Sequence, residues 1–189
     1  MKNSELLQEL ALQNRKLIFF TKDVEVLPEE VLSARPAEEA WSTVECFDHM
    51  NKATELYLNQ IEKKLEQLKP EKGDYKKTMF ASMFTKRLAP TADGEIKSKM
   101  KTLKVFYPKV GVGKEAIEQF KANLERFKVV LIQAKNKDLR SFKVTTALGP
   151  ILKFYLGDAL DFVHAHNRRH VQQIKNTIAA IESRQQSAA

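Results

Sequence analysis

Two histidines of the chain, His166 and His170, are spaced four residues apart. Residues four apart on a helix lie one above the other on the same face. Two imidazoles placed in this way can bind one divalent metal ion, and a histidine from a facing helix can complete a set of three ligands. Three protein ligands with an open fourth position are typical of catalytic zinc sites, whereas structural sites use four.

The third candidate ligand is His49, which lies in a second amphipathic segment. Cys46, Met50 and Ala53 share its helix face, so we expect the imidazole to point inward. The remaining histidine, His164, is two residues from His166 and therefore points about 200° away on a helix. We expect His164 to lie at the surface or just outside the site, and not to be a ligand.

Simpler interpretations of these residues stay open. His166 and His170 could be ordinary surface or core residues, because short motifs often arise by chance. Asn167 stands where the His-Glu-x-x-His motif of zinc proteases has its glutamate base, so that mechanism is excluded as such. The apolar faces carry no second cluster of carboxylates, which argues against a di-iron bundle. Cys46 could approach the metal, but a lone cysteine on an apolar face more often only packs.

Other residues near the histidines have two interpretations each. Arg168 and Arg169 lie between His166 and His170 in the sequence and so beside the site, and either could bind an anionic substrate or lie on a solvated face. Glu45 lies one helical turn before His49, but a capping box with Ser42 is the simpler role. Trp41 is expected to be a core anchor.

Length and composition predict one helical domain over residues 1–189. The hydrophobic fraction of 43% and the charged fraction of 30% are typical of a soluble globular protein. Glycine and proline are scarce, with six of each, which favours helices over a turn-rich β architecture. No apolar run could span a membrane, so we expect no membrane partner. Glu5 and Glu9 interrupt any signal-peptide core, and the single cysteine excludes an internal disulfide, so we expect a cytoplasmic protein.

The net charge is +8, and much of the excess lies between Lys63 and Lys114. A basic surface can attract nucleic acid or anionic substrates. The segment carries no recognised nucleic-acid motif, and aromatic residues do not alternate regularly with the basic ones. We interpret it as a solvated lysine-rich connection and expect no nucleic-acid partner.

Apolar residues recur three and four apart in four long stretches, which is the spacing of amphipathic helices. We predict long helices over residues 4–21, 42–68, 114–135 and 150–183. A short helical turn is expected between Pro28 and Pro36. Residues 141–146 are β-prone but isolated, so we interpret them as an extended loop. These elements predict an all-α four-helix bundle with a long connection between the second and third helices.

The connection over residues 70–113 is less regular. Helix-like spacing near residues 74–87 predicts a short helix, and Met79, Phe80, Met83 and Phe84 should cover part of the bundle. The reason is that a group of exposed apolar side chains is unfavourable in a soluble protein.

Two segments carry a family resemblance. The first is Arg35–His49, which contains Trp-Ser before the second helix and ends in His49. The second is His166–Ile174, which contains His-x-x-x-His and Gln173. On these motifs the chain resembles the DinB-like (YfiT-like) superfamily of metal-dependent enzymes. The resemblance implies an up-down-down-up bundle and a divalent metal ion, typically nickel or zinc, held by His49, His166 and His170.

The resemblance also implies a class of function. Characterised members of that family include thiol S-transferases and isomerases that use low-molecular-weight thiols such as bacillithiol or mycothiol. We therefore expect a small-molecule substrate, with a thiol as co-substrate. The alternatives are a metal-dependent hydrolase, a non-catalytic metal-binding stress-response protein, and, on charge alone, a nucleic-acid-associated protein. The general base and the oligomeric state, a homodimer included, stay open.

Overall fold

The computed structural model describes residues 2–91, 93–96 and 101–188, and this part of the chain is mainly helical. Part of the basic connection, residues 97–100, lies outside the described residues. The α-helices are α1 (Asn3–Glu25), α2 (Glu29–Ser33), α3 (Thr43–Glu62), α4 (Met79–Leu88), α5 (Glu115–Gln133) and α6 (Leu156–Ala188). The short elements are the 3₁₀ turns η1 (Leu65–Gln67) and η2 (Lys104–Phe106) and the strands β1 (Lys143–Thr146) and β2 (Gly149–Tyr155).

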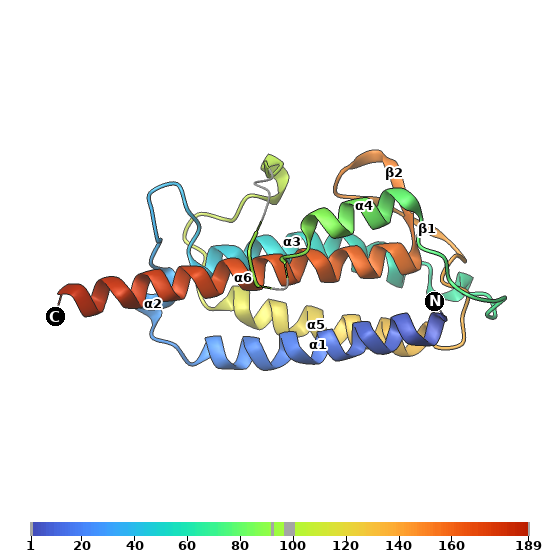
Figure 1. Cartoon of the computed structure of the whole chain (residues 1–189), viewed down its shortest axis with the longest axis horizontal. Helices are drawn as coiled ribbons and strands as arrows, with labels where there is room; N and C mark the ends of the chain where they lie inside the picture. Colours follow the sequence, from blue (N-terminus) through green and yellow to red (C-terminus); the bar gives the residue numbers. More distant parts are fainter. Residues whose placement is uncertain (1, 92, 97–100, 189) are drawn as a thin grey trace.

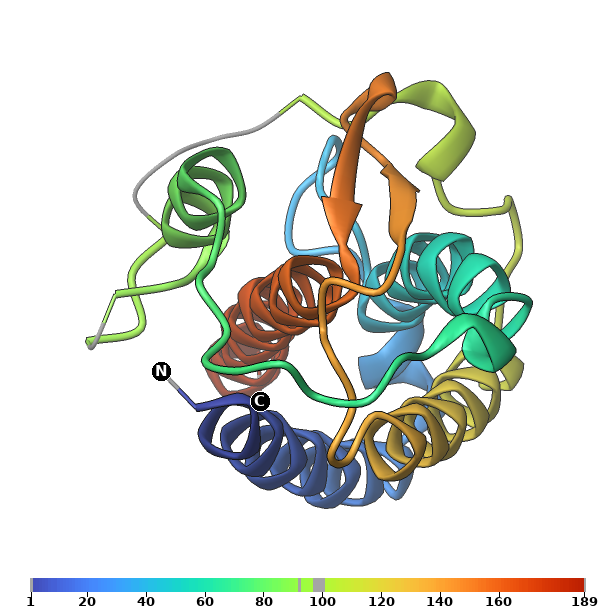
Figure 2. The ribbon, with the colours of Figure 1, turned by 90° about the vertical axis from the view of Figure 1, so that its right-hand side faces the viewer.

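The four long helices lie side by side (Figures 1 and 2). α3 packs against both α5 and α6, and α1 packs against the same two helices. Their apolar faces form two clusters of buried side chains. One contains Leu58, Phe127 and Leu160, and the other contains Phe47, Phe120 and Ile174. The long predicted helices therefore form because each buries an apolar face against two neighbours.

The start of α3 is held by the predicted capping box. The backbone N–H of Ser42 donates to Glu45 Oε2 at 2.8 Å, and the N–H of Glu45 donates to Ser42 Oγ at 3.3 Å. The Arg35 guanidinium also donates to both carboxylate oxygens of Glu45. Glu45 thus ties the segment before α3 to the helix that carries His49.

Glu45 should make part of the folding stability depend on pH. Burial alone would raise the pKa of Glu45, but hydrogen bonds from Arg35 and Ser42 outweigh it and lower the pKa below 4.5. The unfolded state then binds the proton more readily, so this stability is present above pH 4.5 and is lost as the pH falls further. We expect Glu45→Gln to flatten the fall in melting temperature between about pH 5 and pH 3. The exposed Glu30→Gln serves as the control, and an equal flattening there would contradict the assignment.

The β1–β2 hairpin was not predicted. Residues 141–146 were expected to be a loop, and the last helix was expected to begin at residue 150. Instead β1 pairs antiparallel with β2, with Val144 opposite Phe154. Both of these side chains are buried, whereas Ile151 on the same hairpin is 95% exposed. A short apolar run fits either a helix or a strand, and here pairing with β1 decides for the strand. α6 therefore starts at Leu156.

Other predicted boundaries shift by one turn or so. α1 continues to Glu25, and α3 ends at Glu62, after which η1 makes a separate 3₁₀ turn. The expected turn after Pro28 is α2. The short helix of the long connection, α4, begins at Met79 instead of near residue 74, because the Thr78 side chain caps it by accepting from the N–H of Ala81.

The segment before α4 is tied to the first turn of α6 through Asp158. The buried Tyr75 hydroxyl donates to Asp158 Oδ1, and the Thr78 hydroxyl donates to Asp158 Oδ2 at 2.8 Å. The Thr78 N–H also donates to Asp158 Oδ1, at 3.2 Å. Gly157 lets the Tyr75 ring approach the helix, since a Cβ there would lie 2.6 Å from Tyr75 Cζ. This contact positions α4 along α6.

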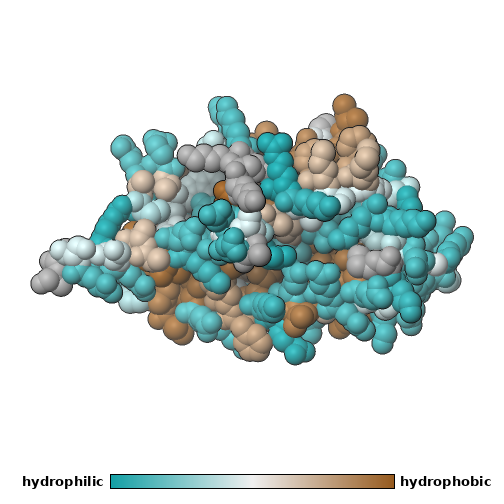
Figure 3. All heavy atoms as spheres, in the orientation of Figure 1, coloured by the Kyte–Doolittle hydropathy of each residue, from teal (hydrophilic) through white to brown (hydrophobic). Residues whose placement is uncertain are grey.

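The predicted apolar cover by α4 is wrong for three of its four residues. Met79, Phe80 and Met83 are 78%, 59% and 52% exposed, while Phe84 packs partly against the core. α4 buries Ala81 and Leu88 toward α6 instead. The reason is the helical phase set by the Tyr75–Asp158 contact. Ile151 of the hairpin is exposed as well. Brown and tan spheres gather at the upper right of Figure 3, over the hairpin and α4.

No helix in the described ranges combines the length and the apolar character needed to cross a bilayer.

Candidate metal centre

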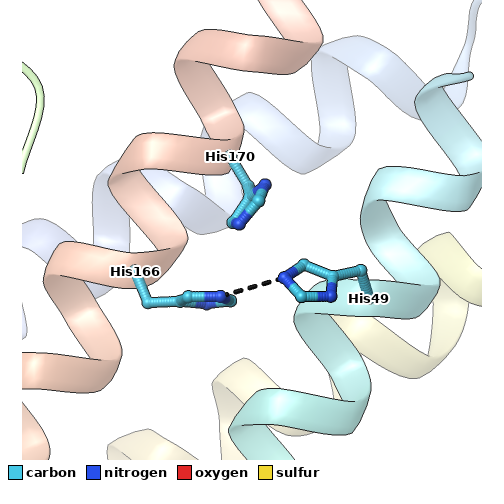
Figure 4. A group of neighbouring side chains, drawn as sticks. All are labelled: His49, His166 and His170. Carbon is cyan, nitrogen blue, oxygen red and sulfur yellow. Dashed lines mark hydrogen bonds between the residues drawn. The ribbon is translucent and has the colours of Figure 1, made fainter. Parts of the chain in front are cut away.

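The structure brings together His49, His166 and His170, the three histidines selected from the sequence. His49 lies in α3, and the other two lie one turn apart on α6 and face it (Figure 4). One nitrogen from each ring can be chosen such that all three lie within 4.8 Å of one another. The packing of α3 against α6 is what brings these distant parts of the chain together.

Hydrogen bonds at the outer ring nitrogens orient two of the imidazoles. His49 Nδ1 lies 2.9 Å from the carbonyl oxygen of Phe106, and His170 Nδ1 lies 2.9 Å from Gln173 Oε1. Because both partners accept, we assign the hydrogen to Nδ1 in each ring, which leaves Nε2 as an acceptor. Metal-binding histidines are commonly held by such an outer acceptor.

The inner nitrogens show that a cation would fit. His49 Nε2 lies 3.1 Å from His166 Nε2, and the ring centre of His170 lies 4.5 Å from each of the other two ring centres. A neutral His166 can donate from Nε2 to His49 Nε2 at this distance; with its hydrogen on Nδ1 instead, both facing nitrogens are acceptors, and a cation between them would satisfy both. The three rings therefore have the donor type and the convergence that a divalent transition metal requires.

Burial keeps these imidazoles neutral, which is the form that binds metal. It lowers the pKa of His166 to about 3, with a further contribution from the nearby His49. Burial also lowers the pKa of His49 and that of His170. At neutral pH the site is thus free of bound protons that would compete with a metal ion.

The Phe106 carbonyl is a part of the site that sequence analysis missed. The segment that carries it is fixed to α3 by two contacts. Asp48 Oδ2 accepts from the N–H of Lys109 at 2.8 Å, and Lys52 Nζ donates to the carbonyl of Tyr107. No residue type identifies a backbone carbonyl that acts as a hydrogen-bond acceptor. The only signal in the sequence was the presence of Asp48 and Lys52 on α3, which bind the segment that carries it.

Trp41 lies against the histidines rather than only in the core. Its ring centre is 4.8 Å from that of His49 and 6.4 Å from that of His170. Trp41 is the single tryptophan of the chain. Tryptophan fluorescence therefore comes from one ring, and that ring contacts the histidine cluster.

A cavity of about 240 Å³ opens onto the three histidines. Its wall combines apolar side chains with the polar groups of Tyr57 and Arg169. The volume lies below the roughly 300–1,000 Å³ of pockets that hold drug-sized ligands. The arrangement therefore gives a small molecule access to the histidine nitrogens.

The prediction for His164 is half right. It is absent from the cluster, as expected, but it is neither at the surface nor beside the site. Its side chain is 2% exposed and meets the Phe127 ring edge-on, with 4.6 Å between ring centres. Neither ring nitrogen of His164 has a hydrogen-bond partner among the residues that the structure describes. Phe127 lies on α5, so the side of α6 that carries His164 faces the interior of the bundle.

The structure also shows where Cys46, Arg168 and Arg169 lie relative to the site. Cys46 is fully buried in the cluster around Phe47 and Phe120, where burial raises the pKa of its thiol. It is not among the residues that converge on the site. Arg168 is exposed, whereas Arg169 is only 9% exposed and lines the cavity. The sequence could not separate these two neighbours without the phase of α6.

Comparison with known proteins agrees with this geometry. The family model of the DinB superfamily matches residues 20–174, most of the chain. The chain belongs to the DinB superfamily. Its match includes the whole stretch from His49 to His170, so all three histidines of this DinB-superfamily protein lie within the matched region. A search of curated proteins and a search of solved structures each give no significant match.

Proposed function

We propose that this DinB-superfamily protein is a metal-dependent enzyme in which His49, His166 and His170 hold a divalent ion, nickel or zinc. The observation that carries the proposal is the convergence on one cavity of three neutral imidazoles, of which those of His49 and His170 are buried and that of His166 is half-buried. Among the described residues, no fourth histidine, cysteine or carboxylate joins the group. A site with three protein ligands leaves a position for a substrate.

The proposal includes the family's up-down-down-up four-helix bundle as a single domain. What supports it is the course of the long helices in Figure 1, where α1 and α6 run opposite to α3 and α5. In such a bundle a metal site is built from side chains on facing helices. His49 on α3 and the pair on α6 fit that plan.

The reaction we propose is the transfer of an organic group between a small-molecule substrate and the sulfur of a low-molecular-weight thiol. A bound divalent ion would lower the pKa of a thiol at its open position and so favour the thiolate. The protein's own residues orient the imidazoles through Phe106 and Gln173 and shield the site with Trp41. The cavity wall beside the histidines consists largely of apolar side chains.

The cavity favours a thiol over water as the nucleophile. No aspartate or glutamate is found among the described residues that line it, so no carboxylate stands ready as a general base for water. A thiol needs less help, because its unperturbed pKa is about 8.5. Hydrolysis is the second candidate, since a metal can also activate water without a base.

The test is coordination of a thiol by the Co(II)-substituted protein. We expect 2-mercaptoethanol to add a sulfur-to-metal charge-transfer band and to shift the visible Co(II) spectrum, because sulfur would enter the open position. His170→Ala should abolish this change. A spectrum that does not respond to thiols, in a protein that retains stoichiometric Co(II), would reject the transferase and leave hydrolysis or a non-catalytic role.

A further inference from the structure

One side of the bundle carries three segments beside the cavity. α4, the β1–β2 hairpin and residues 101–110 lie over α3 and α6, on the side away from α1 and α5 (Figure 2). Each contributes a leucine to the wall of the cavity beside the histidines, namely Leu88, Leu148 and Leu103. Because the three segments surround one cavity, their outward side chains belong to one outer face of the molecule.

This outer face exposes an unusual number of large apolar side chains. α4 presents Met79, Phe80 and Met83, and the hairpin presents Ile151. In the third segment the exposed apolar side chains are Leu103, Val105, Tyr107 and Val110. Single exposed apolar residues are ordinary, whereas a group of them on one face indicates an interaction surface.

The same three segments are basic and contain no aspartate or glutamate. On α4 the exposed Lys86 follows Met83 by three residues, so the two side chains lie on one helix face. On β2 Ile151 and Lys153 are two residues apart and both exposed, so they point to the same side of the strand. In the third segment three exposed lysines alternate with the apolar residues, and these are Lys101, Lys104 and Lys109.

The mixture of apolar and basic groups distinguishes between the occupants of such a face. Nucleic acid would pair with the lysines but would leave Phe80 and Ile151 without an apolar partner. A second copy of the chain, packed through the same face, would bring lysines against lysines, which is unfavourable. The headgroup region of an anionic bilayer offers both an acyl boundary for the apolar side chains and negative charge for the lysines.

We propose that this outer face docks the protein on the surface of an anionic bilayer. The exposed side chains of α4, the hairpin and residues 101–110 enter the boundary between headgroups and acyl chains, and the lysines beside them bind anionic headgroups. Docking of this kind needs no helix that spans the bilayer. It gives a role to part of the basic connection, and it does not depend on the metal or on the proposed reaction.

The test is co-sedimentation of the full-length protein with large vesicles. One set contains phosphatidylglycerol and phosphatidylcholine in equal parts, and the other contains phosphatidylcholine alone. We expect binding to the anionic vesicles to be at least about tenfold tighter, because each lysine near a negative surface contributes severalfold. Salt at about 1 M should remove most of this preference by screening.

Two variants locate the contact. Phe80→Ser and Ile151→Ser should each weaken binding to the anionic vesicles about tenfold, since each removes a large apolar side chain from the bilayer. Both residues are exposed, at 59% and 95%, so neither change should disturb the core. The matched control is Phe19→Ser, because Phe19 is 58% exposed but lies on α1, on the other side of the bundle. We expect it to bind like the wild type.

Each remaining outcome overturns the proposal. Equal binding to both kinds of vesicle removes the role of the lysines, and an equal loss in Phe19→Ser removes the location. A dimer in solution that Phe80→Ser dissociates would identify a second copy of the chain as the occupant. The result is separate from the Co(II) test, because a protein that fails to coordinate thiols could still bind anionic vesicles.

Discussion

Replacement of His166 by alanine is expected to abolish detectable metal binding. His166 Nε2 lies 3.1 Å from His49 Nε2 at the centre of the cluster, so its loss leaves two nitrogens and a void. Loss of a partner outside the ligand set typically lowers metal affinity roughly 10–100-fold, and loss of a ligand should exceed this. His49→Ala and His170→Ala should have the same effect. The measurement is quenching of Trp41 fluorescence during titration with Ni(II), with equilibrium dialysis as a second reading.

The matched control for this experiment is His164→Leu. It removes a histidine from the same helix, but one whose ring meets Phe127 away from the site. We expect this variant to bind Ni(II) with wild-type affinity. Leucine should also be tolerated in the core, because it removes two buried nitrogens that have no partner in the described part of the chain. Loss of Ni(II) binding in a folded His164→Leu protein would show that the wrong three histidines were chosen.

Replacement of Asp158 by alanine should destabilise the protein and release α4. Asp158 is 1% exposed and accepts from Tyr75 and from both the N–H and hydroxyl of Thr78. Alanine would leave the buried Tyr75 hydroxyl and the half-buried donors of Thr78 without their acceptor, which we expect to cost on the order of 3 kcal/mol of unfolding free energy. It also removes a negative charge from the first turn of α6. Urea unfolding measures the first effect, and limited proteolysis across residues 74–88 measures the second.

The neighbouring Asp161→Asn serves as the control. Asp161 forms a partly exposed ion pair with Lys77 on the same two segments, with 2.8 Å between the charged atoms. Such pairs contribute about 1 kcal/mol or less. Similar losses in both variants would mean that charge, and not the buried hydrogen bonds of Asp158, holds α4 in place.

Release of α4 would also change the cavity beside the three histidines. Leu88 at the end of α4 lines the cavity that opens onto the histidines. The anchor at Asp158 therefore positions part of the cavity wall from one end of the helix. Because Asp158 holds one end of α4 and Leu88 is buried at the other, α4 is fixed in place although several of its apolar side chains are exposed.

The sequence by itself determined the long helices and the face on which His49 lies. An amphipathic segment must bury its apolar side in any compact packing, so the period of the pattern settles both the element and the orientation of its residues. The spacing of His166 and His170 likewise places both side chains on one helix face, because four residues complete about one helical turn. The capping box at Ser42 and Glu45 was visible for a similar reason, since it is local in the chain.

Tertiary structure decided the features that depend on a second segment. β2 is a strand because β1 is beside it, although its residues continue the apolar character of α6. The Phe106 carbonyl is hydrogen-bonded to His49 although the two residues are 57 positions apart in the chain, and no side-chain pattern indicates this contact. His164 turned away from the site as its helical angle required, but that direction led into the core because α6 has neighbours on several sides. Angle within a helix is a local property, whereas what lies in that direction depends on how the other helices pack.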